Sequence, residues 1–288
     1  MNLTWNLLLE EGSRRLKEAG VEEADLDAKY LLFEAFDINL SHFIMERNRP
    51  FSANEKDMIS VENYYRMIDL RSARIPLQQI TGNREFMGLP FLVDENVLIP
   101  RQDTETLVEL VLKEYKGKNP SLLDMCTGSG CIAISLAKLG GFDSVTAADV
   151  SEKALQVARK NQEALLKENQ ITFLLSNLFE AFDEDKTFDV IVSNPPYIPT
   201  DVIKGLSPEV RDHEPMLALD GKKDGLYFYK RLAIESRKHL NSLGAVYFEI
   251  GYDQKEAVSG LLKDAGFKKI RSFTDAAGLD RIVSGIYE

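Results

Sequence analysis

The sequence predicts an α/β protein in which a mostly parallel sheet carries helices on both faces and follows a small N-terminal helical bundle. Apolar residues recur at helical spacing from Trp5 to about Arg74. Residues 75–100 are richer in Gly, Pro and alternating β-type segments, which is typical of a hairpin. After Pro100, helical segments alternate with short apolar strands, as in βαβ units. We therefore expect a helical domain at 1–74, a β-hairpin linker at 75–100 and an α/β domain at 101–288.

The α/β alternation can be followed element by element. We expect helices at 104–115, 131–139, 152–168 and 225–239, strands at 121–125, 144–148, 171–175, 189–192 and 244–250, and a C-terminal helix with further strands. In the N-terminal bundle, the breaks between helices are expected at Gly20, 37–41 and 48–50. This bundle is more acidic than basic, which favours a protein-binding role, with simple structural support as the alternative.

Composition excludes several classes of protein. The 288 residues are enough for about two domains, and 44% hydrophobic with 28% charged residues is an ordinary globular mixture. A formal charge of −11 argues against direct binding of nucleic acid. The chain shows neither a signal peptide nor an apolar run long enough to span a membrane, so we expect a cytoplasmic protein, taken here as a monomer. Two cysteines and three scattered histidines predict no metal site.

A glycine-containing loop follows the strand expected at 121–125. It consists of Cys126, Thr127, Gly128, Ser129 and Gly130. Glycines let the backbone turn sharply and approach a ligand closely. Asp149 ends the next expected strand, where a carboxylate can accept hydrogen bonds from both hydroxyls of a ribose. These features predict a nucleoside cofactor. Three alternatives remain. The loop also fits the G-x-G-x-x-A pattern of dinucleotide-binding proteins, or it could be a tight turn that binds no ligand. Asp149 could instead cap a helix.

Asn177 and Leu178 follow the strand expected at 171–175. Residues just beyond the carboxyl ends of parallel strands line the ligand crevice of an open sheet. Asn177 could accept a hydrogen bond from an adenine amino group, and Leu178 could pack on the ring. The alternative is a helix cap followed by a core residue.

The run Asn194-Pro195-Pro196-Tyr197 follows the strand expected at 189–192. Proline has a carbonyl acceptor but no N–H donor, so this loop mainly presents oxygens and suits an incoming NH₂ group. A planar amide or aryl amine is a poor nucleophile because its lone pair is delocalised. The Asn194 side-chain oxygen and the Pro195 carbonyl could hold both N–H hydrogens and direct the nitrogen at an electrophile.

Tyr197 could then stack on the flat substrate group or shield a cationic methyl donor. No strong base is required before transfer, because methylation itself makes the nitrogen acidic. The alternative interpretation of this run is a proline-rich turn that ends a strand.

These motifs resemble those of the peptide chain release factor glutamine methyltransferase family (HemK/PrmC-like), which are S-adenosylmethionine-dependent enzymes of the class I, Rossmann-like methyltransferase fold. The resemblance extends over nearly the whole chain, through residues 76–82, 85–89, 97–105, 124–130, 194–197, 214–219, 249–251 and 280–281.

The resemblance implies methyl transfer from S-adenosylmethionine to the side-chain amide nitrogen, N5, of the glutamine in a release factor's Gly-Gly-Gln motif, with S-adenosylhomocysteine as product. It also implies that the N-terminal bundle helps to dock the release factor. By position, residues 126–130 bind the methionine side of the cofactor, Asp149 the ribose, and Asn177 with Leu178 the adenine. Residues 194–197 hold the glutamine amide, with Asn194 also beside the cofactor.

The chain departs from the family pattern at five positions, none of which removes the chemical centre. These are Cys126 for glycine, Asn177 for aspartate, Leu178 for an aromatic residue, Gln79 for tyrosine and Asp103 for glutamate.

Other functions remain open at this stage. A ribosomal-protein glutamine methyltransferase carries similar motifs, although the surrounding stretches favour the release factor. A DNA adenine amino-methyltransferase uses the same Asn-Pro-Pro-Tyr logic, but the acidic charge disfavours it. If the protein were an NAD-dependent oxidoreductase, residues 194–197 would have no function. If the protein fails to bind S-adenosylmethionine, the sequence favours a non-catalytic binding module.

Overall fold

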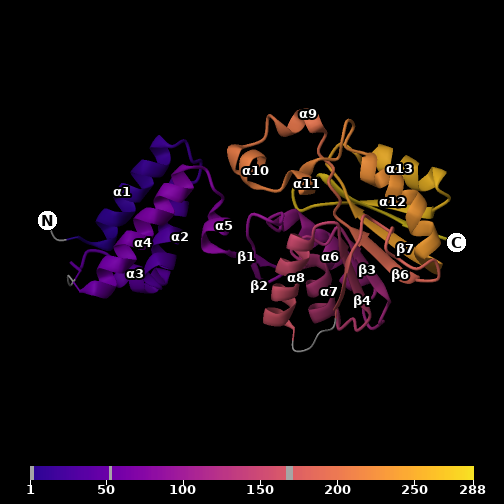
Figure 1. Ribbon diagram of the computed structural model, residues 1–288, viewed down its shortest axis with the longest axis horizontal. Coiled ribbons are helices and arrows are strands. Elements are labelled where there is room, and N and C mark those ends of the chain that lie inside the picture. Colours follow the sequence, from indigo (N-terminus) through magenta and orange to yellow (C-terminus); the bar gives the residue numbers. More distant parts are fainter. Residues whose placement is uncertain (1–2, 52–53, 167–170) are drawn as a thin grey trace. The chain divides into compact units, whose positions relative to one another are not determined.

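The computed structural model describes residues 3–51, 54–166 and 171–288 and divides the chain into two compact units (Figure 1). The first consists of Met1–Gly82 together with Pro208–His213. The second consists of Asn83–Ser207 and Glu214–Glu288. The predicted linker at 75–100 is thus shared: its first residues belong to the helical unit, and its hairpin belongs to the α/β unit.

The first unit is a helical bundle around one apolar core. Its helices are α1 (Trp5–Glu18), α2 (Ala24–Phe36), α3 (Leu40–Glu46), α4 (Glu55–Ser72) and α5 (Leu77–Thr81). Leu8 and Leu16 of α1, Leu31 of α2, and Tyr64 and Ile68 of α4 are fully buried in this core. The helices break near the predicted positions, and the side chains of Asn39 and Asn54 cap α3 and α4, whereas no side chain caps α2.

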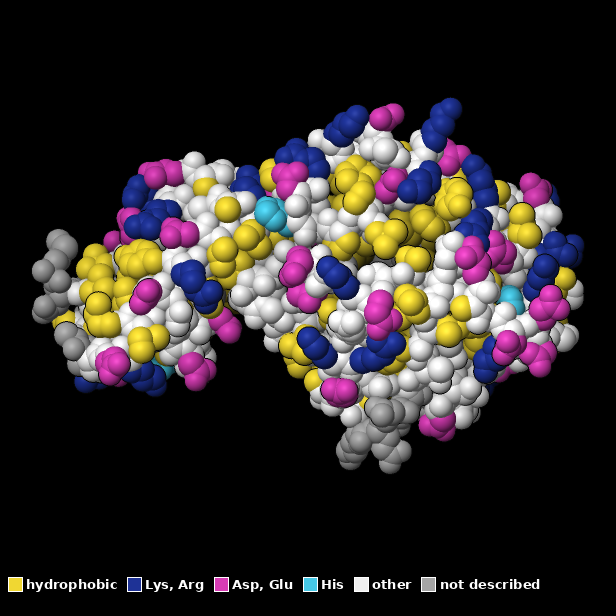
Figure 2. Space-filling model, in the orientation of Figure 1, with side chains coloured by type: hydrophobic (Ala, Val, Ile, Leu, Met, Phe, Trp, Pro, Cys, Tyr) yellow, Lys and Arg dark blue, Asp and Glu magenta, His cyan; other side chains and the backbone are white. Residues whose placement is uncertain are grey.

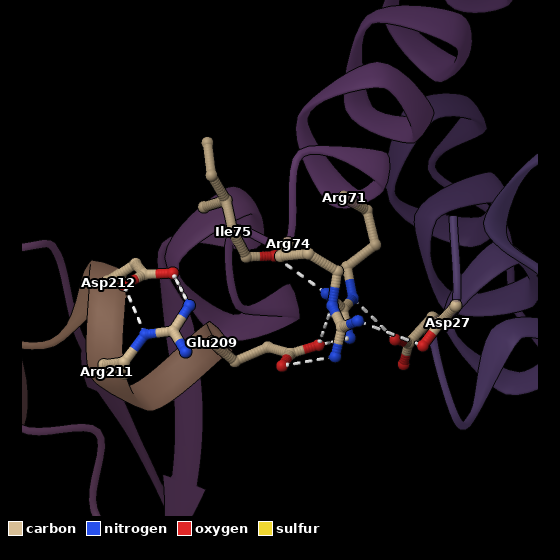
Figure 3. Close-up of polar contacts among 8 residues, drawn as sticks. Asp27, Arg71, Arg74, Ile75, Glu209, Arg211 and Asp212 are labelled. Carbon is tan, nitrogen blue, oxygen red and sulfur yellow. Dashed lines mark hydrogen bonds and ion pairs between the residues drawn. The ribbon is translucent and has the colours of Figure 1, made fainter. Parts of the chain in front are cut away.

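A short helix from much later in the chain, α10 (Pro208–His213), completes the first unit. Figure 3 shows its carboxylate, Glu209, facing two guanidinium groups of the bundle. Glu209 accepts two hydrogen bonds of 2.7 Å from Arg74 and one of 2.9 Å from Arg71, which also donates to Asp27 over 2.7 Å. Burial raises the pKa of Glu209, but the hydrogen bonds from the two arginines outweigh it and lower that pKa to about 2. Glu209 is therefore charged at neutral pH.

The second unit is built on a seven-stranded sheet with the order β5-β4-β3-β6-β7-β9-β8. The strands are β3 (Leu122–Met125), β4 (Val145–Asp149), β5 (Ile171–Leu175), β6 (Phe188–Ser193), β7 (Leu240–Glu249), β8 (Lys268–Thr274) and β9 (Asp280–Ile286). Strands β3 to β7 are parallel, and β9 runs antiparallel to both β7 and β8. The predicted mostly parallel sheet is confirmed.

Helices cover both faces of this sheet (Figure 1). They are α6 (Gln102–Glu114), α7 (Cys131–Gly140), α8 (Glu152–Leu165), α12 (Tyr227–Glu235), the 3₁₀ helix η1 (Ser236–His239) and α13 (Lys255–Asp264). Successive residues of a strand point to opposite faces. Leu122 therefore packs in one apolar cluster with α6 and α7, while Leu123 packs in a second cluster with α12 and α13.

A two-stranded hairpin precedes the sheet in the second unit. Strands β1 (Asn83–Phe86) and β2 (Leu89–Leu92) pair antiparallel, with Phe86 opposite Leu89. The two turn residues, Met87 and Gly88, both have positive φ, at 53° and 71°, as a two-residue type I′ turn requires. Phe86 and Phe91 are buried in the cluster that contains α6 and α7.

The structure corrects two expectations about the helices and leaves a third untested. The helix predicted at 225–239 is two elements, α12 and η1. The short helices α9 (Thr200–Ile203), α10 and α11 (Met216–Leu219) were not predicted. The end predicted for α8 at residue 168 lies outside the described residues. Over the part of the chain that the structure describes, no helix combines the length and apolar character needed to cross a membrane.

Candidate active site

The predicted site residues lie where two central strands end. Strands β3 and β6 are neighbours in the sheet, and the strand order reverses between them, with β4 and β5 on one side and β7 on the other. Ligands of open α/β sheets bind at such a reversal, beyond the carboxyl ends of the strands. A cavity of about 350 Å³ lies here, lined by residues that follow β3, β4, β5 and β6. Figure 2 shows hydrophobic side chains gathered around a hollow in the region of α11 and α12.

The loop after β3 has a backbone that a glycine-poor sequence could not adopt easily. Gly130, which precedes α7, has a φ of 80°, and a Cβ atom there would lie 3.0 Å from Ile134 and 3.1 Å from Ala158. Cys126 also has a positive φ, 64°, which only glycine adopts without strain. The departure from the family's glycine at this position therefore has a backbone cost. Burial raises the pKa of the Cys126 thiol, which is thus protonated at neutral pH.

A fully buried carboxylate holds this loop in shape. Asp124 accepts hydrogen bonds from the Thr127 hydroxyl over 2.6 Å and from the Ala133 backbone N–H over 3.2 Å. It thereby connects the end of β3 to the first turn of α7. Burial raises the pKa of Asp124 to about 7, against the effect of these hydrogen bonds.

Asp149 lies at the end of β4 and lines the cavity. One carboxylate oxygen accepts the Gly128 N–H over 2.9 Å, and the other accepts the Ser151 N–H over 2.9 Å. The helix-cap alternative is wrong, because the residue that caps α8 is Ser151, whose hydroxyl accepts the Ala154 N–H. Each carboxylate oxygen has a second lone pair, so the oriented Asp149 side chain can still accept hydrogen bonds from a ligand.

Asn177 and Leu178 follow β5 and also line the cavity. Leu178 is buried in the apolar cluster that contains α12 and α13, as the core-residue alternative expects, and also lines the cavity. The Asn177 side chain is exposed and donates to Glu180 over 2.7 Å, while its oxygen accepts from Arg231 over 3.3 Å. A turn rather than a helix follows Asn177, so the helix-cap alternative does not apply here either.

The run after β6 contributes unequally to the cavity. Asn194 and Pro196 line it, whereas Pro195 is buried and neither Pro195 nor Tyr197 is among the lining residues. The Asn194 amide nitrogen donates to the Thr104 hydroxyl over 3.4 Å, which leaves its oxygen as an acceptor. No hydrogen bond found between described residues uses the Pro195 carbonyl oxygen. Of the two predicted acceptors, the Asn194 side chain therefore lies in the cavity lining, whereas Pro195 lies between two lining residues, Asn194 and Pro196.

Tyr197 is held by its backbone and packs with the cluster beneath α12 and α13. Its carbonyl accepts a hydrogen bond of 3.0 Å from the Gln254 side chain. Gly225 lies so close that a Cβ atom there would be 2.3 Å from the Tyr197 carbonyl oxygen. Burial raises the pKa of Tyr197 to about 12. In this arrangement Tyr197 contributes to the packing that holds the loop in place.

Three parts of the cavity lining were not predicted from the sequence. They are the segment before α6, which includes Arg101, the residues Pro215, Leu217 and Ala218 around α11, and the residues Lys222, Tyr227 and Phe228 before and at the start of α12. Arg101 donates to Glu214 over 2.6 Å and so connects the first part to the second. These two parts belong to stretches that carry the family resemblance, which was the available signal, but neither lies at the end of a sheet strand.

Two family models match most of the chain. Residues 8–82 match the family model of the PrmC N-terminal domain, and residues 102–204 match that of the methyltransferase small domain. Among solved structures, the catalytic domain of hMettl16 in complex with MAT2A 3′UTR hairpin 1 gives a TM-score of 0.58 over 91% of each chain, at 19% identity. A methyltransferase from Pyrococcus furiosus gives 0.51 over 78% of this chain and 98% of that one, also at 19% identity. These structures bear on the fold alone.

Relatives of known name cover almost the whole chain. The release factor glutamine methyltransferase of Clostridium botulinum is 40% identical over 96% of both chains. That of Flavobacterium psychrophilum is 41% identical over 88% of this chain and 89% of its own. The chain therefore belongs to the release factor glutamine methyltransferase family.

Proposed function

We propose that this protein transfers a methyl group from S-adenosylmethionine to the side-chain amide nitrogen of the glutamine in the Gly-Gly-Gln motif of a peptide chain release factor. The single observation that carries the proposal is the placement of the Asn194 side chain, whose amide nitrogen donates to Thr104, in the lining of a cavity at the reversal point of the sheet. Family membership supports the choice of acceptor.

The residues around the cavity fit a nucleoside with a charged amino-acid tail. Asp149 presents oriented carboxylate oxygens for the ribose hydroxyls, and Leu178 presents an apolar surface for the base. The loop 126–130 allows close approach of the methionine part, and Arg101 places a cation in the lining. Asn177 can accept a hydrogen bond from the adenine once its side-chain oxygen no longer accepts one from Arg231. When bound, S-adenosylmethionine supplies an electrophilic methyl group on a positively charged sulfur.

The chain's own residues orient the acceptor. The Asn194 side-chain oxygen and the Pro195 carbonyl each accept one N–H of the glutamine amide, which fixes the plane of the amide and aims the nitrogen lone pair along the line of transfer. The nitrogen gains a methyl group and then loses one proton, because N-alkylation makes the amide nitrogen strongly acidic. No residue is required to remove a proton before transfer. Pro196 excludes water from this side of the cavity.

The helical unit is proposed to dock the release factor. Large apolar side chains are exposed on α3 and at the start of α4: Leu40 (52%), Ile44 (58%), Met45 (76%), Met58 (57%) and Ile59 (53%). Exposed apolar groups of this kind mark contact surfaces for other proteins.

The test is transfer of a radiolabelled methyl group from S-adenosylmethionine to purified release factor. Parallel reactions contain a Gln→Ala variant of the Gly-Gly-Gln motif, ribosomal protein, or duplex DNA. The proposal expects label on the wild-type release factor alone. Label on ribosomal protein or DNA, with none on the release factor, would replace the acceptor and keep the methyltransferase chemistry.

A further inference from the structure

A buried carboxylate that the proposed mechanism does not use lies next to Asn194. Strands β6 and β7 are parallel, with Ser193 at the end of β6 beside Phe248; Asn194 follows Ser193 as Glu249 follows Phe248, which brings Asn194 close to Glu249. Glu249 is 1% exposed, and its Oε2 atom has no hydrogen-bond partner among the described residues. A buried, incompletely paired carboxylate is costly, so its position beside the substrate-holding side chain calls for a functional reason.

Thr104 of α6 is the third member of this group. It is 2% exposed, lines the cavity, and its hydroxyl oxygen accepts the 3.4 Å hydrogen bond from the Asn194 amide nitrogen. The side chains of Thr104 and Asn194 also lower the pKa of the Glu249 carboxyl, so both lie close to it. A hydroxyl oxygen that accepts from the Asn194 amide nitrogen and a buried carboxylate thus lie close to the Asn194 side chain.

The backbone around Glu249 is rigid. Glu249 pairs with Ile282 in the antiparallel ladder between β7 and β9, and its carbonyl accepts a 2.6 Å hydrogen bond from the buried Tyr229 hydroxyl. The Glu249 backbone therefore has a fixed place relative to the end of β6, and burial confines its carboxylate. A fixed acceptor can impose an orientation on a neighbouring amide, whereas a mobile one cannot.

We propose that Glu249 and Thr104 are positioning residues that fix which end of the Asn194 side-chain amide faces the substrate. An ionised carboxylate only accepts hydrogen bonds, so it draws the NH₂ end of Asn194 towards itself and leaves the oxygen for the glutamine amide. With the amide reversed, Asn194 would present N–H groups to the N–H groups of the substrate. This inference rests on the proposed methyl transfer and adds the residues that orient its central acceptor.

The first test replaces the charge and keeps the shape. Glu249→Gln is compared with Glu114→Gln, which removes the charge of another hydrogen-bonded glutamate of the same unit that contacts Tyr247 and Arg271 outside the cavity. For Glu249→Gln, we expect kcat to fall by roughly ten- to a hundredfold, with the Kd for S-adenosylmethionine within about twofold of wild type. Glu114→Gln retains kcat. An unchanged kcat in Glu249→Gln, with wild-type enzyme active, overturns the inference.

A second pair of variants is independent of Glu249. Thr104→Val removes the hydroxyl at nearly constant volume, and Thr104→Ser restores it; Thr146→Val, in the buried part of β4, is the matched control. We expect a loss of kcat in Thr104→Val, rescue in Thr104→Ser and wild-type kcat in the control. Equal losses in the Val and Ser variants would show a packing role and contradict the inference.

A double-mutant cycle separates positioning from general structural support. If Glu249 acts through Asn194, then Glu249→Gln lowers the residual rate of an Asn194→Ala enzyme by less than about twofold, since the side chain to be oriented is already absent. Fully additive losses would show that Glu249 acts elsewhere. Inactivity of the wild-type enzyme on release factor would instead refute the proposed function, so the two failures are distinguishable.

The dependence of kcat on pH distinguishes a positioning role of Glu249 from a packing role, because a packing role would not change it. Burial raises the pKa of Glu249 to about 7, while hydrogen bonds and Arg281 act in the opposite direction. The titratable groups that interact with Glu249 are Asp103 of α6, Cys131 of α7, Tyr197, Tyr229 of α12 and Arg281 of β9. Protonated Glu249 can donate to the Asn194 oxygen, so wild-type kcat should fall as pH drops below about 7. Glu249→Gln should lack this fall; an identical profile would contradict the inference.

Discussion

The Gly128 backbone N–H donates a hydrogen bond of 2.9 Å to Asp149 Oδ2, which joins the loop after β3 to the carboxylate at the end of β4. The other Asp149 oxygen accepts the Ser151 N–H over 2.9 Å. The carboxylate is thus oriented before any ligand arrives, and part of the entropic cost of binding is already met by the fold.

Replacing Asp149 should weaken cofactor binding. In Asp149→Asn, one side-chain atom becomes an N–H donor that faces either the Gly128 or the Ser151 backbone N–H. We expect the Kd for S-adenosylmethionine, measured by calorimetry, to rise by roughly ten- to a hundredfold, since a hydrogen bond to a charged group contributes about 1.5–3 kcal/mol. Glu152→Gln, at an exposed carboxylate in the first turn of α8, should bind as wild type. Equal Kd values for both variants would remove Asp149 from the ribose site.

Replacing Asn194 should affect turnover and spare binding. Asn194→Ala removes the side-chain acceptor proposed for the glutamine amide, so we expect kcat to fall by at least about a hundredfold, comparable to the loss of one preorganised group in other active sites. The Kd for S-adenosylmethionine should stay within about threefold of wild type. Rapid-quench kinetics and calorimetry give the two quantities separately. Near-normal turnover would exclude Asn194 from the chemistry.

The backbone at Cys126 predicts a stabilising substitution. Cys126 has a φ of 64°, so Cys126→Gly should relieve strain and raise the free energy of unfolding by about 0.5–1 kcal/mol, after the entropic cost of glycine. Cys131→Gly is the matched control, because Cys131 is buried at the start of α7 and loses helix propensity and packing. It should therefore lower the free energy of unfolding. The same sign of change in both variants would refute the strain at Cys126.

The ion pairs of Glu209 should hold α10 in the helical unit. In Glu209→Gln, the hydrogen bonds from Arg71 and Arg74 lose their charged acceptor, and we expect faster hydrogen exchange in the peptide that covers 208–213. Asp212→Asn removes the exposed partner of Arg211 in the same helix (Figure 3), a kind of pair that contributes about 0–1 kcal/mol. Its exchange should match wild type. Unchanged exchange in Glu209→Gln would mean that apolar contacts alone retain α10.

The fold was largely predictable because its parallel strands are short buried apolar runs that alternate with helical periodicity. Strand β5 was predicted at its observed bounds, Ile171–Leu175. Among the short helices that were not predicted, α10 has six residues and is bound by arginines more than 130 positions earlier in the chain. Local sequence patterns carry no signal for a helix that long-range ion pairs stabilise.

The site was predictable where it follows strand ends. Gly130, Asp149, Leu178 and Asn194 were placed in one crevice because parallel strands bring their carboxyl ends to the same edge. Asp149, Leu178 and Asn194 line the cavity, and Gly130 precedes α7. Arg101 could not be placed this way, because its position depends on the buried Glu214. Tyr197 was expected against the substrate, a role that stays a prediction, while in the structure its backbone is held by Gln254.

Mass spectrometry of the release factor after incubation with this protein and S-adenosylmethionine tests the central claim most directly. The account predicts a gain of one methyl group, located by peptide fragmentation on the glutamine side chain of the Gly-Gly-Gln motif. It also predicts no gain with the Gln→Ala release factor. Absence of methylation on that glutamine, under conditions where calorimetry shows that the cofactor binds, would contradict it.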